Sequence, residues 1–329
     1  MATTASIAGI INMDRNPFVA LGLFLILGLT ADQNVINTVI HSNLPQPISN
    51  NAVASVSFSG SDTANATADS TLLLSFMGLQ SGKTYKHVVS KAYQVSINQK
   101  DWKEIPPVPG SEGRLASIAV GVDQYVYIFG GYTVAEDHSE VSTPTVYRYD
   151  PIKQSYERLA DMPTPVDDTI AMVYHNCYIY LVSGWHNTGN VDAVQVYDIQ
   201  ENRWNRATPY PGTAVFGHSG GIVENTMIVA DGVKKVWLDT GKNDYTFKLS
   251  DECYQGTINP KDPLDITWQK LPKHSGKPVY RAASTGSAVD NMVIFAGGSS
   301  VSYNYNGIGY KDTPAPPSNN LFTWDLDTH

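Results

Sequence analysis

Five apolar runs that end in glycine recur along this chain, and they constrain the fold more than any other feature. The runs cover residues 71–78, 125–131, 177–184, 226–232 and 292–298. Their glycine ends lie roughly 50 to 65 residues apart, a spacing typical of repeat architectures. Each run is short enough for a buried strand, and glycine at its end permits a positive φ or a close approach of the backbone. The chain is therefore expected to be an array of similar β modules.

Each run belongs to a longer unit of four strand-like segments. A segment of small and apolar residues precedes the run, as in residues 114–122, 169–175 and 281–289. A variable loop follows the run, then a strand with an aromatic or aliphatic residue, and seven residues later another aromatic. The pairs are Val95 and Trp102, Tyr149 and Tyr156, and Tyr197 and Trp204, with Trp268 in the fourth copy. One small sheet cannot bury both faces alone, so successive sheets are expected to pack face to face around an axis.

This pattern resembles the kelch repeat, in which an apolar run, a Gly-Gly pair, a tyrosine and a tryptophan follow at fixed separations. The Gly-Gly pair is intact at Gly130-Gly131 and at Gly297-Gly298. The resemblance covers about residues 51–329 and implies an all-β, kelch-type β-propeller whose glycines and aromatics are core residues. Five blades are visible, at about residues 51–110, 111–165, 166–213, 214–278 and 279–329.

The fifth blade is expected to lack its own outer strand. Trp324 corresponds to Tyr149 and Tyr197, and the aromatic due seven residues later would fall at position 331, beyond His329. We favour a C-terminally truncated copy of a six-bladed parent, because kelch rings usually have six or seven blades. In the alternative, the ring has five blades, and residues 35–47, which read as an outer strand with a proline exit, complete the fifth.

The N-terminal segment carries an apolar stretch, residues 17–31, that suits the h-region of a signal peptide. This stretch is shorter than the about 20 residues that a membrane span needs. Residues 1–31 are therefore interpreted as a signal peptide or, alternatively, as an uncleaved anchor, and residues 32–50 lead into the first blade. Translation from Met13 would give a short n-region. A periplasmic or secreted protein is expected.

Net charge limits the expected partners, and the two cysteines bear on whether a disulfide forms. Lys and Arg number 22 against 31 Asp and Glu, a formal net charge of −9. Nucleic acids and anionic membrane surfaces attract basic faces, so neither is an expected partner, apart from a membrane at the N-terminal anchor. Cys177 and Cys253 lie in strand-like stretches of different repeats, and two unpaired buried thiols are favoured over one disulfide. We expect no cofactor and no metal.

Loops on one side of the blades are expected to form the ligand site, because rigid scaffolds commonly carry function on loops. The substrate-binding candidates follow the glycine ends or precede the inner strands, and they are Arg114, Tyr132, Asp168, Trp185, His186, Arg281 and Tyr303. The planar guanidinium of an arginine suits a carboxylate, since it donates two parallel hydrogen bonds. In the alternative interpretation, each arginine is a solvated turn residue, and Asp167-Asp168 forms a simple turn.

The chain also resembles the bacterial N-acetylneuraminate epimerase group. The resemblance rests on residues 113–131, on VIFAGG followed by the loop SYNYNGIGYKDT, and on the apolar N-terminal segment. It implies a free acidic sugar as substrate, whose anomers interconvert through the open-chain keto form. That reaction needs one group to remove the anomeric hydroxyl proton and another to protonate the ring oxygen.

Asp231 and His218 are the catalytic candidates for such a reaction. The family carries a glutamate where this chain has Val233, and Asp231 is the nearest carboxylate. Lys234, Lys235 or His218 are the other substitutes for that glutamate. The alternative for His218 is a satisfied histidine near the propeller axis.

Two other functions compete with a mutarotase-like enzyme. One is a non-catalytic interaction module that binds a protein or a glycan, and the other is a non-functional truncated copy. Cys253 and Tyr254 are adjacent, but no ligand set like that of the copper site in galactose oxidase accompanies them. The expected function is an exported carbohydrate-binding propeller whose partner is a small acidic sugar or a glycan.

Overall fold

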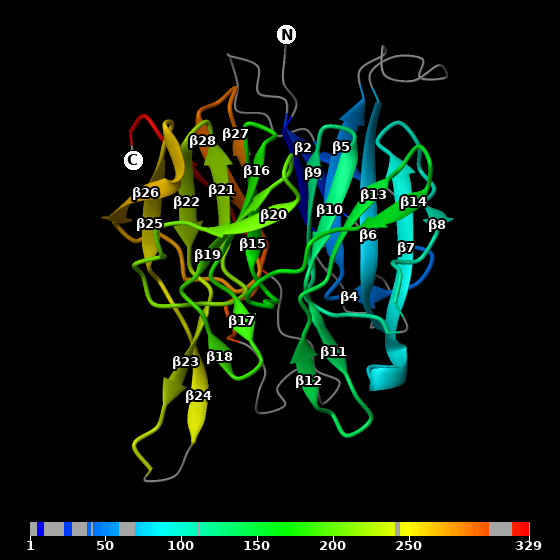
Figure 1. Ribbon diagram of the computed structural model, residues 1–329, viewed down its shortest axis with the longest axis horizontal. Helices are drawn as coiled ribbons and strands as arrows, with labels where there is room; N and C mark the ends of the chain where they lie inside the picture. Colours follow the sequence, from blue (N-terminus) through cyan, green and yellow to red (C-terminus); the bar gives the residue numbers. More distant parts are fainter. Residues whose placement is uncertain are drawn as a thin grey trace. The chain divides into compact units, whose positions relative to one another are not determined.

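The computed structural model describes residues 5–9, 23–27, 38–40, 42–58, 70–110, 112–240, 244–302 and 318–328. In these residues the regular structure is β, apart from one 3-10 turn, Tyr85–His87. The all-β class expected from the repeats is thus confirmed, and Figure 1 shows the antiparallel sheets that build it.

The first two sheets belong to an N-terminal unit that comprises Ser6–Asp167 and Ile199–Trp204. Sheet one has the order β4-β6-β7-β8, and β5 also pairs with β6. Its strands are β4 (Ile48–Ser49), β5 (Ala52–Phe58), β6 (Ser70–Gln80), β7 (Val88–Ser96) and β8 (Lys103–Ile105). Sheet two has the order β14-β13-β10-β9. Its strands are β9 (Ile118–Val122), β10 (Tyr125–Phe129), β13 (Val146–Asp150) and β14 (Ser155–Arg158).

The C-terminal unit comprises mainly Asp168–Asp198 and Asn205–His329, and it holds most of the third sheet and all of the fourth and fifth. Sheet three has the order β15-β16-β19-β20, and sheet four has the order β21-β22-β25-β26. The strands of sheet three are β15 (Ile170–Tyr174), β16 (Tyr178–Val182), β19 (Val194–Asp198) and β20 (Arg203–Arg206). Those of sheet four are β21 (Ser219–Val223), β22 (Thr226–Ala230), β25 (Cys253–Asn259) and β26 (Asp262–Leu271).

Sheet five has three strands in the order β27-β28-β29, so the expected absence of its own outer strand is confirmed for the described residues. The strands are β27 (Ala283–Ser287), β28 (Met292–Ala296) and β29 (Leu321–Asp325). The described part of residues 35–47 does not complete this sheet. Its strand β3 (Thr38–Ile40) instead pairs with β2 (Leu23–Leu27), which also pairs with β1 (Ala5–Gly9). Export through residues 17–31 remains a prediction.

Small two-stranded hairpins lie in the variable loops that follow the glycine-terminated runs. Each lies between the second and third strands of its sheet. They are β11 (Tyr132–Val134) with β12 (Glu140–Ser142), β17 (Trp185–His186) with β18 (Gly189–Asn190), and β23 (Val233–Trp237) with β24 (Tyr245–Leu249). These hairpins were not predicted, although they carry several of the candidate residues.

Apolar clusters fill the spaces between successive sheets within each unit. In the N-terminal unit, buried side chains such as Ala54 and Phe76 of sheet one pack with Val126 and Tyr149 of sheet two. In the C-terminal unit one cluster joins sheets three and four, and another joins sheets four and five. This face-to-face burial is the stabilising principle expected for propeller blades, since it removes the facing surfaces of adjacent sheets from water.

The second aromatic of a repeat forms a hydrogen bond with the segment that follows the outer strand of the preceding sheet. Each side chain donates a hydrogen bond to a backbone carbonyl there: Tyr156 to Pro106 (2.7 Å), Trp204 to Ala160 (2.9 Å) and Trp268 to Thr208 (3.3 Å). Trp102 likewise donates to Ser42 (2.9 Å), just after β3. The recurring aromatic therefore packs against the neighbouring module, as predicted.

Both cysteines are free, as expected, but only Cys253 is buried. Burial of Cys177 was predicted wrongly. His175, Asn176 and Cys177 form the turn between β15 and β16, and His175 and Asn176 have φ of +51° and +54°. The apolar stretch thus begins one residue later than the sequence suggested, with Tyr178.

Candidate functional site

Three entrances to inner strands lie side by side in the C-terminal unit. Asp168, Gly217 and Arg281 stand at matching places before β15, β21 and β27, with φ of +48°, +57° and +56°. The Gly217 amide donates to the Asp168 carbonyl and the Arg281 amide donates to the Gly217 carbonyl, both at 2.7 Å. This left-handed backbone position recurs from sheet to sheet, and the ladder of hydrogen bonds brings the side chains of Asp168 and Arg281 together.

Asp168, Tyr280 and Arg281 form an entrance cluster. Arg281 Nε donates to Asp168 Oδ1 at 2.6 Å, Nη2 forms an ion pair with the same oxygen, and the Tyr280 hydroxyl donates to Oδ2 at 3.3 Å. The side chain of Arg281 is 28% exposed whereas that of Asp168 is 7% exposed. The carboxylate therefore fixes the guanidinium at the surface and offsets part of its charge.

A row of aromatic rings continues from the entrance cluster. Tyr280 contacts Phe216, with ring centroids 5.9 Å apart. Phe216 in turn contacts Trp185 and Phe247, both at 5.4 Å, and Trp185 lies 5.6 Å from Phe247. Phe216 and Phe247 are buried with Val233, whereas Trp185 is half-buried. The structure thus brings the predicted Trp185 into the same surface region as Arg281, while His186 follows it on the hairpin β17–β18.

Asp231 is a buried carboxylate with several hydrogen bonds inside the protein. His274 Nε2 lies 3.0 Å from Oδ1 and 2.9 Å from Oδ2, and the Val279 amide donates to Oδ2 at 3.0 Å. Only 1% of the Asp231 side chain is exposed. His274 also stacks on Phe322, with ring centroids 4.5 Å apart. These contacts tie the end of β22 to the chain that enters sheet five, which is a structural task; a catalytic role for Asp231 remains a prediction.

His218 is a buried neutral histidine. Its Nε2 lies 2.8 Å from the Val182 carbonyl, to which the neutral imidazole donates its proton. Burial lowers the pKa of His218 to about 4, and the Val182 hydrogen bond only partly offsets that effect. Nδ1 has no hydrogen-bond partner among the described residues. The residue is 3% exposed and Nδ1 is buried, so the unprotonated nitrogen does not face solvent.

The His274–Asp231 pair predicts a pH-dependent stability. The hydrogen bond to Asp231 raises the pKa of His274, burial opposes the shift, and the charges of Asp231 and Asp251 add to it. The Gly276 amide donates to Nδ1 at 3.1 Å, which favours the neutral imidazole and limits the rise of the pKa. The pKa is still raised, because the carboxylate of Asp231 is charged. Protonated His274 therefore stabilises the fold below its unfolded pKa of about 6.5, and this contribution is lost as pH rises through the raised folded value.

Urea unfolding of the wild-type protein and of His274→Gln at about pH 5.5 and about pH 8.5 measures this contribution. The wild type should exceed the variant in stability by more at the lower pH. A difference that stays constant or grows as the pH rises would contradict the assigned charge on His274.

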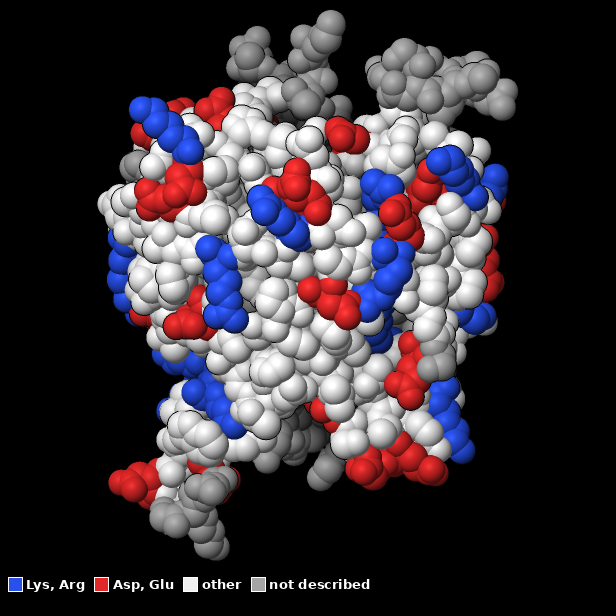
Figure 2. Space-filling view, viewed as in Figure 1, with Lys and Arg blue, Asp and Glu red and all other residues white. Residues whose placement is uncertain are grey.

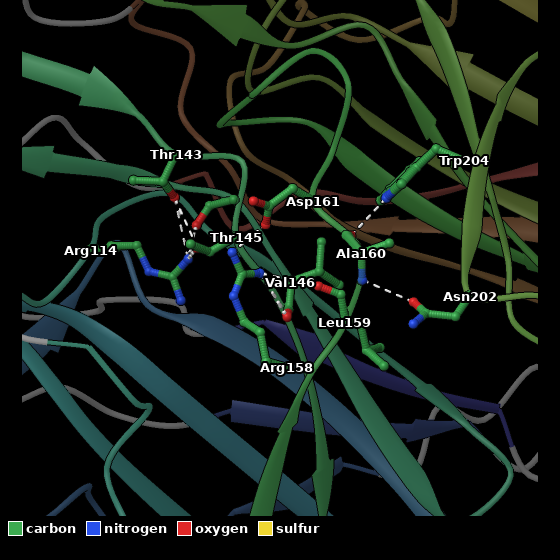
Figure 3. Close-up of polar contacts among 11 residues, drawn as sticks. Arg114, Thr143, Thr145, Val146, Arg158, Leu159, Ala160, Asp161, Asn202 and Trp204 are labelled. Atoms are coloured by element: carbon green, nitrogen blue, oxygen red, sulfur yellow. Dashed lines mark hydrogen bonds and ion pairs between the residues drawn. The ribbon is translucent and has the colours of Figure 1, made fainter.

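In the N-terminal unit, Arg114 is directed into its own sheet rather than outward. Figure 3 shows its guanidinium turned toward Thr143 and Thr145, whose hydroxyls both accept from Nη1. Nη1 also donates to the Gly130 carbonyl at 2.8 Å. Burial and, to a smaller extent, the charge of Arg158 lower the pKa of Arg114 to about 10, against a rise from Tyr147. Arg114 is 5% exposed, so it positions the end of β10.

Arg114 and Arg281 do not occupy matching positions in their repeats. Leu115 bridges Tyr132, just as Tyr280 bridges Ser299. Arg114 therefore precedes the bridging residue and Arg281 follows it. Tyr132 is 8% exposed in this bridge.

The other predicted residues fall in separate places. Asp167 is a buried residue of the N-terminal unit and accepts from the Ser142 hydroxyl at 2.6 Å. Asp167 and Asp168 thus hold side-chain partners in addition to any turn that they form. Tyr303 lies outside the described residues.

Three further features of the described residues concern surface charge, metal binding and membrane spans. Figure 2 shows basic and acidic side chains interspersed over the face in view. Within the described ranges, no group of three or more His, Cys, Asp or Glu residues is arranged to hold a metal ion. The same ranges contain no helix long and apolar enough to cross a membrane.

Comparison with known proteins agrees with this architecture. The Kelch motif matches residues 119–163, which run from β9 past the end of β14. The chain is an all-β propeller that contains a kelch motif. The solved structure of YjhT superimposes on this propeller with a TM-score of 0.59 and 15% identity, covering 86% of this chain and 84% of that one. A likeness at that identity supports the fold.

Proteins similar in sequence to this chain include an epimerase and longer kelch-like proteins. N-acetylneuraminate epimerase from Salmonella enteritidis PT4 is 23% identical over 247 residues, 63% of this chain and 60% of that protein. Kelch-like protein 15 from Gallus gallus is 30% identical over 162 residues, 49% of this chain and 31% of that protein. The form from Danio rerio is 31% identical over 136 residues, and the propeller spans 22% of its length. The propeller thus spans a third or less of these kelch-like relatives.

Several residues near the site were not singled out from the sequence. Tyr280, His274, Trp237 and Tyr245 all contact predicted residues or their neighbours. The alternation in VKKVW and YTFKL, which places every second side chain on one face, is the signal that would have revealed the hairpin carrying Trp237 and Tyr245.

Proposed function

We propose that this propeller binds an acidic sugar, such as N-acetylneuraminate, over the loops of its C-terminal unit. The observation that carries the proposal is the entrance cluster, Asp168, Tyr280 and Arg281, which Phe216 connects to the half-buried ring of Trp185. A held guanidinium suits a carboxylate, and neighbouring aromatic rings suit the apolar face of a sugar. The likeness to N-acetylneuraminate epimerase supports this choice of ligand. We also propose export, on the apolar segment 17–31.

Mutarotation of the bound sugar is a second candidate function, favoured by the same likeness. Its acid and base are not evident, since Asp231 is engaged by His274 and Val279 and His218 is buried and neutral. Binding is therefore the function that the geometry supports best. NMR of freshly dissolved N-acetylneuraminate tests turnover: faster anomer exchange with the protein supports the enzyme, and an unchanged rate rejects it.

Arg281→Ala should weaken N-acetylneuraminate binding at least about tenfold, because a charge-assisted hydrogen bond contributes about 1.5–3 kcal/mol. Isothermal titration calorimetry measures the change. Arg203→Ala, at an exposed position of β20, is the matched control and should bind as the wild type does. If a folded Arg281→Ala protein retains the wild-type affinity, the entrance cluster is not the site.

A further inference from the structure

The hairpin β23–β24 has one face that changes from buried to exposed along its length. Val233, Lys235 and Trp237 alternate along β23, and Tyr245 and Phe247 lie opposite Trp237 and Lys235 on β24. At the base, Val233 is fully buried and Phe247 is 9% exposed within the aromatic row. At the tip, Trp237 is 63% exposed. The next residue, Leu238, is also exposed (38%), so this end of the hairpin leaves adjacent apolar side chains in water.

Lys235 lies among aromatic rings on this face. Its Nζ is 4.0 Å from the ring centroid of Tyr245, 4.2 Å from that of Trp237 and 5.8 Å from that of Trp185. These distances are those of cation–π contacts, which hold the ammonium group without neutralising it. Loss of water around the group lowers the pKa of Lys235. The ammonium is therefore held in a defined place on the exposed half of the hairpin.

The charge of Lys235 has no acidic partner within the described part of the chain. Its polar contact there is a hydrogen bond from Nζ to the Thr188 carbonyl at 2.7 Å. An ammonium group has three donors, so donors remain for an anion. Arg281 differs, because Asp168 already offsets its charge. Lys235 thus offers a second cationic group for a carboxylate, separate from Arg281.

Two hairpins fix the position of this lysine. Asn190 of β18 donates from Nδ2 to the Val233 carbonyl at 3.1 Å, and its Oδ1 accepts from the Lys235 amide at 3.0 Å. These paired bonds join β17–β18 to β23–β24 beside Trp185. A binding surface held in this way loses little conformational entropy when a ligand arrives.

We propose that Lys235, Trp237 and Tyr245 form an outer subsite for a second acidic sugar residue of a longer glycan. Lys235 binds the carboxylate of that residue, and the exposed indole of Trp237 packs on its apolar face. The row Tyr280, Phe216 and Trp185 connects the entrance cluster to Lys235 through successive ring contacts. The subsite rests on the proposed binding of acidic sugars at the entrance cluster and makes an acidic oligosaccharide the preferred ligand.

Calorimetric titration with N-acetylneuraminate and with its α2,8-linked disaccharide tests the subsite. The wild-type protein should bind the disaccharide about tenfold more tightly, the size of one charge-assisted hydrogen bond or one packed ring. Lys235→Gln and Trp237→Ala should each remove most of that gain and leave the affinity for the monosaccharide unchanged. Lys234→Gln, on the opposite face of the same strand, is the matched control and should keep the gain.

The two proposals fail in different ways. Equal affinity for mono- and disaccharide, or a gain that survives both Lys235→Gln and Trp237→Ala, overturns the outer subsite but leaves the entrance cluster. Absence of binding by either sugar overturns both. Trp237→Phe should restore most of the gain lost in Trp237→Ala, and failure of that rescue in a folded protein would also count against a packed ring.

Discussion

Asp231→Ala should lower the free energy of unfolding by about 3–5 kcal/mol, the usual effect of removing one partner of a buried charged pair. The substitution leaves His274 Nε2 and the Val279 amide without their acceptor in a site where 1% of the carboxylate side chain is exposed. It also places alanine at φ +64°, a left-handed conformation that alanine adopts less readily than aspartate or asparagine. Urea denaturation followed by fluorescence measures the loss.

Asp231→Asn is the matched control for this prediction. An asparagine oxygen in the place of Oδ2 accepts from both His274 and Val279 and suits the backbone conformation, but its amide NH2 in the place of Oδ1 meets the Nε2 proton. Part of the stability should therefore return. If Asp231→Ala unfolds like the wild type while abolishing mutarotation, Asp231 acts in chemistry and its structural role is refuted.

Gly286→Ala should destabilise the protein by about 3 kcal/mol or more, at the upper end of the cost of overpacking a core. A Cβ at this position on β27 would lie 1.9 Å from the Ile222 carbonyl oxygen and 2.7 Å from the carbonyl carbon of β21. Both contacts are backbone atoms, which cannot rotate away as a side chain can. The inner strands of sheets four and five would have to separate.

Gly189→Ala provides the control, since a Cβ there meets no atom within 4 Å. Thermal and urea unfolding of the two variants should differ by most of the predicted loss. Equal stabilities would show that the inner strands of adjacent sheets do not pack as closely as described.

Much of this architecture could be predicted because its determinants are local and repeated. The glycine-terminated runs became the second strands, and the aromatic seven residues after each third-strand residue became the donor to the preceding module. Close packing at Gly286 and at Gly121, whose Cβ would lie 2.0 Å from the Ser55 carbonyl oxygen, was not predicted. A glycine inside a strand indicates close packing, but it does not identify the neighbouring residue.

The site was harder to predict because it depends on single-residue register and on long-range pairing. Arg114 and Arg281 look alike in sequence, yet Arg114 precedes the bridging residue of its repeat and Arg281 follows it, so one is buried and the other is part-exposed. His274 meets Asp231 across 43 positions of sequence, and Asp168 meets Arg281 across 113. No short motif encodes such pairs.

Calorimetric titration of the wild-type protein with N-acetylneuraminate and with its methyl ester tests carboxylate recognition most directly. The ester keeps the sugar ring and removes the negative charge that Arg281 would bind. The acid should bind at least about tenfold more tightly than the ester. Equal affinities, or no binding of the acid, would contradict an acidic-sugar site on this propeller.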